Sequence, residues 1–149
     1  MEPVLVTRSL RIAVAPERVW ASLADGDGLS GWLADAVAID VVPGASGTAI
    51  DGGVVRRIVI TDVDAGRSLG FTWWDEQAPE VASTVVITVD AVDGGSVVTV
   101  TERLVGATST GANLGLAGVE DLAAVGQGWD RRLAALLGLD DLADRVARV

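Results

Sequence analysis

The reactive side chains of this sequence belong to few types, and this limits the chemistry that the protein can perform. The 149 residues include no histidine, cysteine, tyrosine or lysine, so all eleven basic residues are arginines. These absences exclude a Ser-His-Asp triad, a thiol nucleophile, a lysine Schiff base and a metal held by His or Cys. Acid–base chemistry would therefore depend on Asp and Glu.

Glu102 is the candidate site residue with the clearest position. It alternates with Val98 and Val100, so in a β-strand its side chain shares their apolar face. A carboxylate on such a face needs a polar or charged partner, and an inward-pointing Arg57 would supply one. One interpretation is a pair that anchors a ligand in an apolar pocket, so that Glu102→Gln weakens binding without unfolding the protein. The other is a structural pair, or a strand end near solvent.

Tryptophan supplies most of the aromatic surface, since the chain has five Trp residues and one Phe. Trp32, Phe71, Trp73 and Trp129 come from separate segments that a compact fold would bring together. They either line a cavity for an apolar or aromatic ligand or fill the core. Trp74 points away from Trp73 and is either covered by the acidic loop that follows it or exposed to a partner. The candidate ligand-binding residues are Trp32, Arg57, Phe71, Trp73, Val85, Ile87, Val100, Glu102, Trp129 and Leu133.

Three aspartates, Asp25, Asp27 and Asp35, surround a short predicted helix but lack the spacing of a calcium-binding loop. We interpret them as helix-capping and turn residues. No lysine follows the glycines between residues 44 and 53, and they do not open a helix, so they indicate strand turns rather than a phosphate-binding loop. We therefore expect no metal and no cofactor.

The composition is that of a globular protein, with 50% hydrophobic and 21% charged residues. The formal net charge of −10 opposes binding to nucleic acids and to anionic membrane surfaces. No apolar run approaches the roughly 18 residues of a membrane span, and the N-terminus does not resemble a signal peptide. These features predict a cytoplasmic protein without a membrane span.

The candidate residues must be positioned by a long amphipathic helix and a series of strands. Between Val119 and Leu137 apolar residues recur every three or four positions, which is the period of one helix face. Two short helices are expected after the first strand, one starting at Pro16 and one at residues 29–33, and a further short helix at 140–149. This order favours an α+β fold with a mostly antiparallel sheet. The strands are predicted at residues 4–14, 36–42, 47–51, 54–63, 69–74, 83–91 and 96–104.

Several short motifs, in a fixed order, carry a family resemblance. They are Ala15–Trp20 (APERVW), Trp32, Pro43-Gly44, Leu69–Trp73 (LGFTW), Val98–Glu102 (VTVTE), and Gly128-Trp129 with Leu133 and Leu136. Through them the chain resembles the START-like (SRPBCC, Bet v-like) superfamily, in the branch homologous to the C-terminal domain of the activator of heat shock protein 90 ATPase. The resemblance covers roughly residues 8–137 and implies one domain over residues 1–149. The implied fold is a helix-grip, in which a curved antiparallel sheet of six to seven strands surrounds the C-terminal helix and an apolar cavity.

The resemblance leaves three functions open, because fold does not determine function. The first is binding of a small hydrophobic or amphipathic molecule, such as a lipid, between sheet and helix. The second is a protein-interaction or co-chaperone-like module that works through its surface. The third is an enzyme of cyclase or hydrolase type that uses a cavity carboxylate, which the absence of His and Tyr disfavours. Monomer and dimer both remain open.

Overall fold

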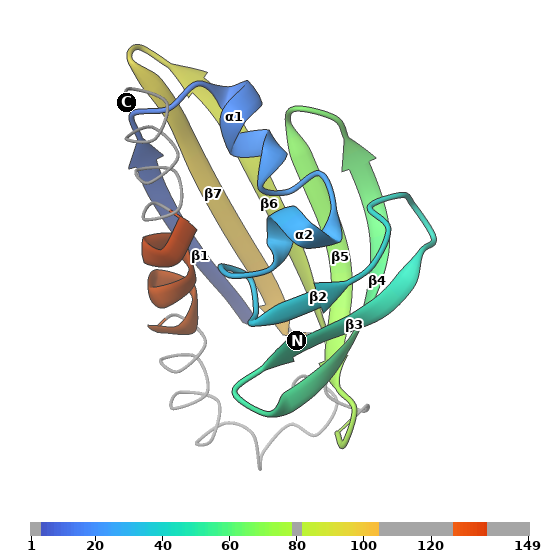
Figure 1. The fold of residues 1–149 in the computed structure, drawn as a ribbon. Helices are drawn as coiled ribbons and strands as arrows, with labels where there is room; N and C mark the ends of the chain where they lie inside the picture. Colours follow the sequence, from blue (N-terminus) through green and yellow to red (C-terminus); the bar gives the residue numbers. More distant parts are fainter. Residues whose placement is uncertain (1–3, 79–81, 105–126, 137–149) are drawn as a thin grey trace.

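A curved antiparallel sheet of seven strands is the framework of the structure (Figure 1), a computed structural model that describes residues 4–78, 82–104 and 127–136. The strands are β1 (Val4–Ile12), β2 (Ala36–Ala38), β3 (Ser46–Asp51), β4 (Val54–Asp64), β5 (Ser68–Asp75), β6 (Ala82–Val92) and β7 (Gly95–Leu104). The helices are α1 (Pro16–Ala21), α2 (Gly26–Leu29) and residues 127–136, which we call the C-terminal segment. The strand order, β1-β7-β6-β5-β4-β3-β2, pairs the first strand with the last. The predicted α+β helix-grip fold is confirmed.

The two faces of the sheet differ because side chains alternate along each strand. In β5, Leu69, Phe71 and Trp73 are buried on the inner, concave face, as their spacing predicted. Trp74 is half-buried on the outer face. Figure 1 shows α1, α2 and the C-terminal segment on the inner side of the sheet, so the apolar face of each strand meets the helices.

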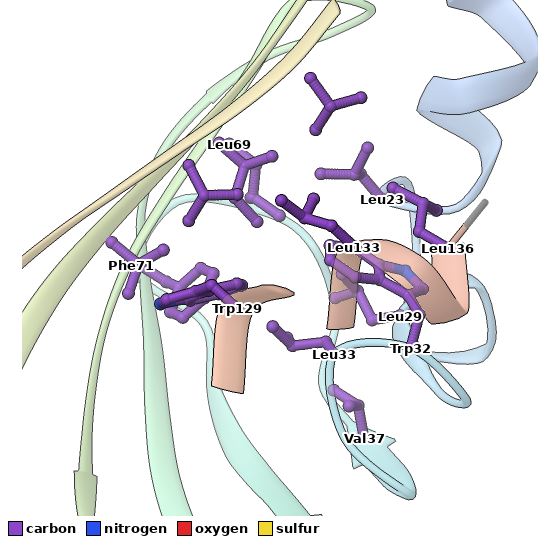
Figure 2. Packing of buried hydrophobic residues seen from close by; sticks show 14 of the residues in the cluster. Leu23, Leu29, Trp32, Leu33, Val37, Leu69, Phe71, Trp129, Leu133 and Leu136 are labelled. Carbon is purple, nitrogen blue, oxygen red and sulfur yellow. The ribbon is translucent and has the colours of Figure 1, made fainter. Parts of the chain in front are cut away.

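The C-terminal segment contributes its apolar side to the core. Figure 2 shows Trp129, Leu133 and Leu136 directed into the same apolar cluster as Phe71 and Leu29. Trp129 and Phe71 are fully buried and Leu133 is 4% exposed. At these positions protein side chains therefore fill the space between the sheet and the C-terminal segment.

The structure corrects the predicted boundaries of one helix and one strand. The helix expected at residues 29–33 is α2, which begins earlier because the Asp25 side chain accepts a hydrogen bond from the backbone N–H of Gly28 at 2.7 Å. Trp32 follows this helix, and its indole Nε1–H donates to the Ser22 carbonyl at 2.9 Å. The second strand ends at Ala38 rather than at residue 42. Of the predicted long helix, residues 119–126 and 137 lie outside the described residues, as does the predicted helix at 140–149.

The outer face of the sheet carries a shallow hollow of about 500 Å³. It is lined by Pro43, Thr61, Asp62, Val63, Asp64, Ser68, Gly70 and Val86.

In the described ranges, no group of three or more acidic side chains is placed to hold a metal ion. None of the helices described is both long and apolar enough to cross a membrane.

Candidate functional site

A buried carboxylate held by two indoles lies where the C-terminal segment meets the sheet. Glu102 is only 5% exposed. Its Oε1 accepts a hydrogen bond from Trp129 Nε1–H at 2.8 Å, and its Oε2 accepts one from Trp73 Nε1–H at 2.8 Å and another from the Ser83 hydroxyl. Both carboxylate oxygens are therefore engaged by neutral donors of the protein. We call Trp73, Ser83, Glu102 and Trp129 the indole–carboxylate cluster.

Strand register explains how three strands bring this cluster together. Trp73 of β5 lies directly opposite Ser83 of β6, and Val85 of β6 lies directly opposite Glu102 of β7. Because residues two apart on a strand share a face, Ser83, Val85 and Glu102 all point inward at neighbouring positions. The C-terminal segment then adds Trp129, whose ring stacks on that of Trp73 with centroids 5.9 Å apart and planes at 27°.

Arg132 fixes the C-terminal segment to the opposite side of the core. Its side chain is buried, its Nε donates to the Leu33 carbonyl at 2.8 Å, and one of its terminal nitrogens contacts Asp51 Oδ2 at 3.4 Å. Its guanidinium carbon lies 5.0 Å from the centre of the Trp129 ring and 5.3 Å from that of Trp73. Arg132 thus connects the C-terminal segment to the loop that follows α2 and also to β3.

The electrostatic environment of Arg132 is unfavourable for a cation. Burial lowers the pKa of its guanidinium, and the nearby positive charge of Arg56 lowers it further, while the charges of Asp51 and Glu102 oppose this shift. Arginine nevertheless stays protonated in proteins. The site therefore holds a desolvated positive charge with a second positive charge close by.

Arg56, and not Arg57, is the arginine of β4 that faces the cluster. Its guanidinium carbon lies 4.3 Å from the centre of the Trp73 ring, and its side chain is half-buried. Arg57 is exposed on the outer face, because inward-facing Ile58 and alternation along the strand direct it outward. The predicted pairing of Arg57 with Glu102 is therefore wrong.

The other predicted site residues lie in the buried core, and Trp32 is apart from the cluster. Phe71 packs edge-on against Trp73 at 5.2 Å between centroids. Trp32 is buried in the same core, but its indole N–H is bound to the Ser22 carbonyl rather than to Glu102. The remaining predicted residues, Val85, Ile87, Val100 and Leu133, are buried apolar core.

Four residues at this site were missed by sequence reasoning, namely Asp51, Arg56, Ser83 and Arg132. A signal for Arg132 exists, since it lies three positions after Trp129 and residues at this spacing are neighbours on a helix surface. Ser83 could have been found from the register of the β5 and β6 strands, which place it opposite Trp73.

A family model matches most of the chain. The model for Activator of Hsp90 ATPase homolog 1-like protein matches residues 13–139. This agrees with the resemblance that the sequence motifs indicated. No curated protein matches the chain.

Solved structures of low sequence identity share the fold. Protein MLL2253 from Mesorhizobium loti has a TM-score of 0.77 at 19% identity, with 93% of this chain and 97% of that chain covered. The Aha1 dimer from Colwellia psychrerythraea has a TM-score of 0.69 at 16% identity, with 89% and 92% covered. CalU16 from Micromonospora echinospora has a TM-score of 0.66 at 19% identity, with 93% and 83% covered. These likenesses support the helix-grip architecture.

Proposed function

The chain belongs to the family of Activator of Hsp90 ATPase homolog 1-like proteins, and from its geometry we propose that it binds a small, flat, apolar molecule at the indole–carboxylate cluster. The ligand would lie against the face of the Trp73 ring that Arg56 covers. This is the hydrophobic-ligand function expected from the sequence, to which the proposal adds a position.

The observation that carries the proposal is the burial of Glu102 among aromatic rings. A buried polar cluster is seldom the most stable way to fill a core, since well-packed apolar residues of similar volume often serve as well or better. Here a carboxylate, two indole N–H groups and a hydroxyl occupy the same end of an otherwise apolar inner face. A few placed polar groups in an apolar, aromatic surrounding are typical of sites for small molecules.

The flexible side chain of Arg56 covers one face of the Trp73 ring. Trp73 is 2% exposed, and the half-buried Arg56 lies over its ring. Arginine has a long stem that moves its charged group into water at low cost. Rotation of Arg56 away from the ring would uncover an indole face without any movement of the sheet. Flat ligands match this surface, because aromatic rings prefer offset-stacked or edge-on contact.

Calorimetric titration with neutral 2-naphthylacetamide tests this function. We expect saturable binding to the wild-type protein with one site per chain. Trp73→Leu removes the stacking surface and should weaken binding up to about tenfold, since an aromatic pair contributes about 0.5–1.5 kcal/mol beyond its buried area. Circular dichroism checks that the variant is folded.

Trp74→Leu is the matched control, because Trp74 is the next residue of β5 but lies on the outer face. It should leave the dissociation constant unchanged. Absence of saturable binding to the wild-type protein, or equal losses in the two variants, would contradict the proposed site.

A specific feature of the outer face favours a second candidate function, contact with another protein. Ile50 is 40% exposed, Val86 is 42% exposed, and Trp74 is half-buried there. All helices in the described ranges lie on the inner side (Figure 1). The family takes its name from an activator of the Hsp90 ATPase, so a co-chaperone-like role would use this face. The Trp74→Leu variant then loses a protein contact and keeps the small ligand.

A further inference from the structure

We infer that the ligand of the indole–carboxylate cluster carries a carboxylate group, and that Arg56 pairs with it. This inference rests on the proposed function and goes beyond it, because it assigns the ligand's charge and the residue that recognises that charge. The ligand class is a small aromatic acid.

In the part of the chain that the structure describes, the N–H donors of Arg56 have no hydrogen-bond or ion-pair partner. Asp51 is bound by Arg132 at 3.4 Å and by Arg131 at 3.8 Å, and both oxygens of Glu102 are engaged within the cluster. Among residues 4–78, 82–104 and 127–136, no carboxylate or carbonyl pairs with the Arg56 guanidinium, which lies over the face of Trp73. A half-buried guanidinium with unused N–H donors is suited to an external anion.

The charges next to the site leave room for an anion, although the whole chain is acidic. The nearby arginines are Arg56, Arg131 and Arg132. The nearby carboxylates are Asp51, which Arg131 and Arg132 contact, Glu102, whose charge acts on Arg132, and Asp75, which lies opposite Arg56 in the sheet. Arg56 and buried Arg132 repel each other, and an anion between them would reduce that repulsion. Charges farther away than the Debye length of about 8–10 Å at ordinary ionic strength are largely screened, so the groups adjacent to Arg56 matter more than the formal net charge of −10.

The same geometry favours a carboxylate joined to a ring. The planar guanidinium group of arginine can donate two parallel hydrogen bonds to the two oxygens of a carboxylate. These two bonds make the pair strong and fix its geometry. When Arg56 rotates off the Trp73 ring, it stays anchored on β4 next to the uncovered ring. If an aromatic ligand stacks on Trp73, a carboxylate attached to the edge of the ligand's ring would lie within reach of Arg56.

A matched pair of ligands tests the inference. 2-Naphthylacetate and 2-naphthylacetamide have the same ring and nearly the same shape but differ in charge. For the wild-type protein at low salt, we expect the acid to bind at least tenfold more tightly than the amide. Arg56→Gln should reduce this preference to about twofold or less, with little change in the dissociation constant of the amide. Added salt should also reduce it.

Arg57→Gln is the control, since it removes the same charge from the adjacent residue on the outer face. It should keep the preference for the acid. Equal binding of acid and amide to the wild-type protein would overturn the inference while the proposed function stands. A preference that survives Arg56→Gln would overturn the assignment to Arg56. If neither compound binds, the proposed function fails and this inference fails with it.

Discussion

Replacing Glu102 with Leu is expected to lower the free energy of unfolding by about 3–5 kcal/mol, because it removes the common acceptor of three buried hydrogen-bond donors. The substitution leaves the indole N–H groups of Trp73 and Trp129 and the Ser83 hydroxyl without their acceptor. Each such buried donor costs about 1–3 kcal/mol when unpaired. Urea denaturation followed by far-ultraviolet circular dichroism measures the change.

Glu102→Gln should have a smaller effect, about 1–3 kcal/mol. The glutamine side chain keeps one oxygen that can accept a hydrogen bond. Its NH₂ group replaces the other oxygen and so faces a donor instead of accepting from it. This expectation differs from the one drawn from the sequence, in which the substitution left the fold unaffected, because both carboxylate oxygens accept hydrogen bonds from protein donors.

Glu76, exposed in the turn after β5, is the control. Glu76→Leu and Glu76→Gln should stay within about 0.5 kcal/mol of wild type. Wild-type stability in Glu102→Leu would mean that the cluster does not hold the fold together.

The second large effect is expected for Trp129→Ala, which should cost about 3–5 kcal/mol. The side chain is fully buried, stacks on Trp73 and donates to Glu102. Its removal leaves a cavity between the C-terminal segment and the sheet and one carboxylate oxygen without its donor. Since natural domains are stable by only about 5–15 kcal/mol, the variant should unfold at a clearly lower urea concentration.

Two further variants separate packing from hydrogen bonding at this position. Trp129→Phe keeps an aromatic ring but removes the N–H donor, so it should cost about 1–3 kcal/mol. Trp74→Ala removes a half-buried indole from the outer face and should cost less than Trp129→Ala. Equal losses for Trp74→Ala and Trp129→Ala would contradict the account of the core.

The inner face of the sheet was predictable where apolar and polar residues alternate clearly. In β5 and β7 this alternation placed Phe71, Trp73, Val100 and Glu102 correctly. The β4 strand gave no such signal, because apolar residues occupy both of its faces. Its sequence therefore did not show which of two adjacent arginines points inward.

The polar contacts of the site depend on distant parts of the chain. Arg132 lies between the apolar positions Trp129 and Leu133 of the predicted helix, and arginine is mostly exposed in proteins, so the local pattern favours an exposed side chain. It is buried because the Leu33 carbonyl and Asp51, far away in the sequence, supply its partners. Such pairings follow from the tertiary arrangement of the helix and the sheet, which a local pattern does not contain.

Side-chain nuclear magnetic resonance shows directly whether a small aromatic ligand binds at the indole–carboxylate cluster. The five tryptophans each give one indole N–H signal, and single Trp→Phe variants assign them. On titration with 2-naphthylacetate, we expect saturable shifts of the Trp73 and Trp129 signals, with little change for Trp20 and Trp74. Shifts confined to Trp74, or no saturable shift at Trp73 and Trp129, would contradict binding at this cluster.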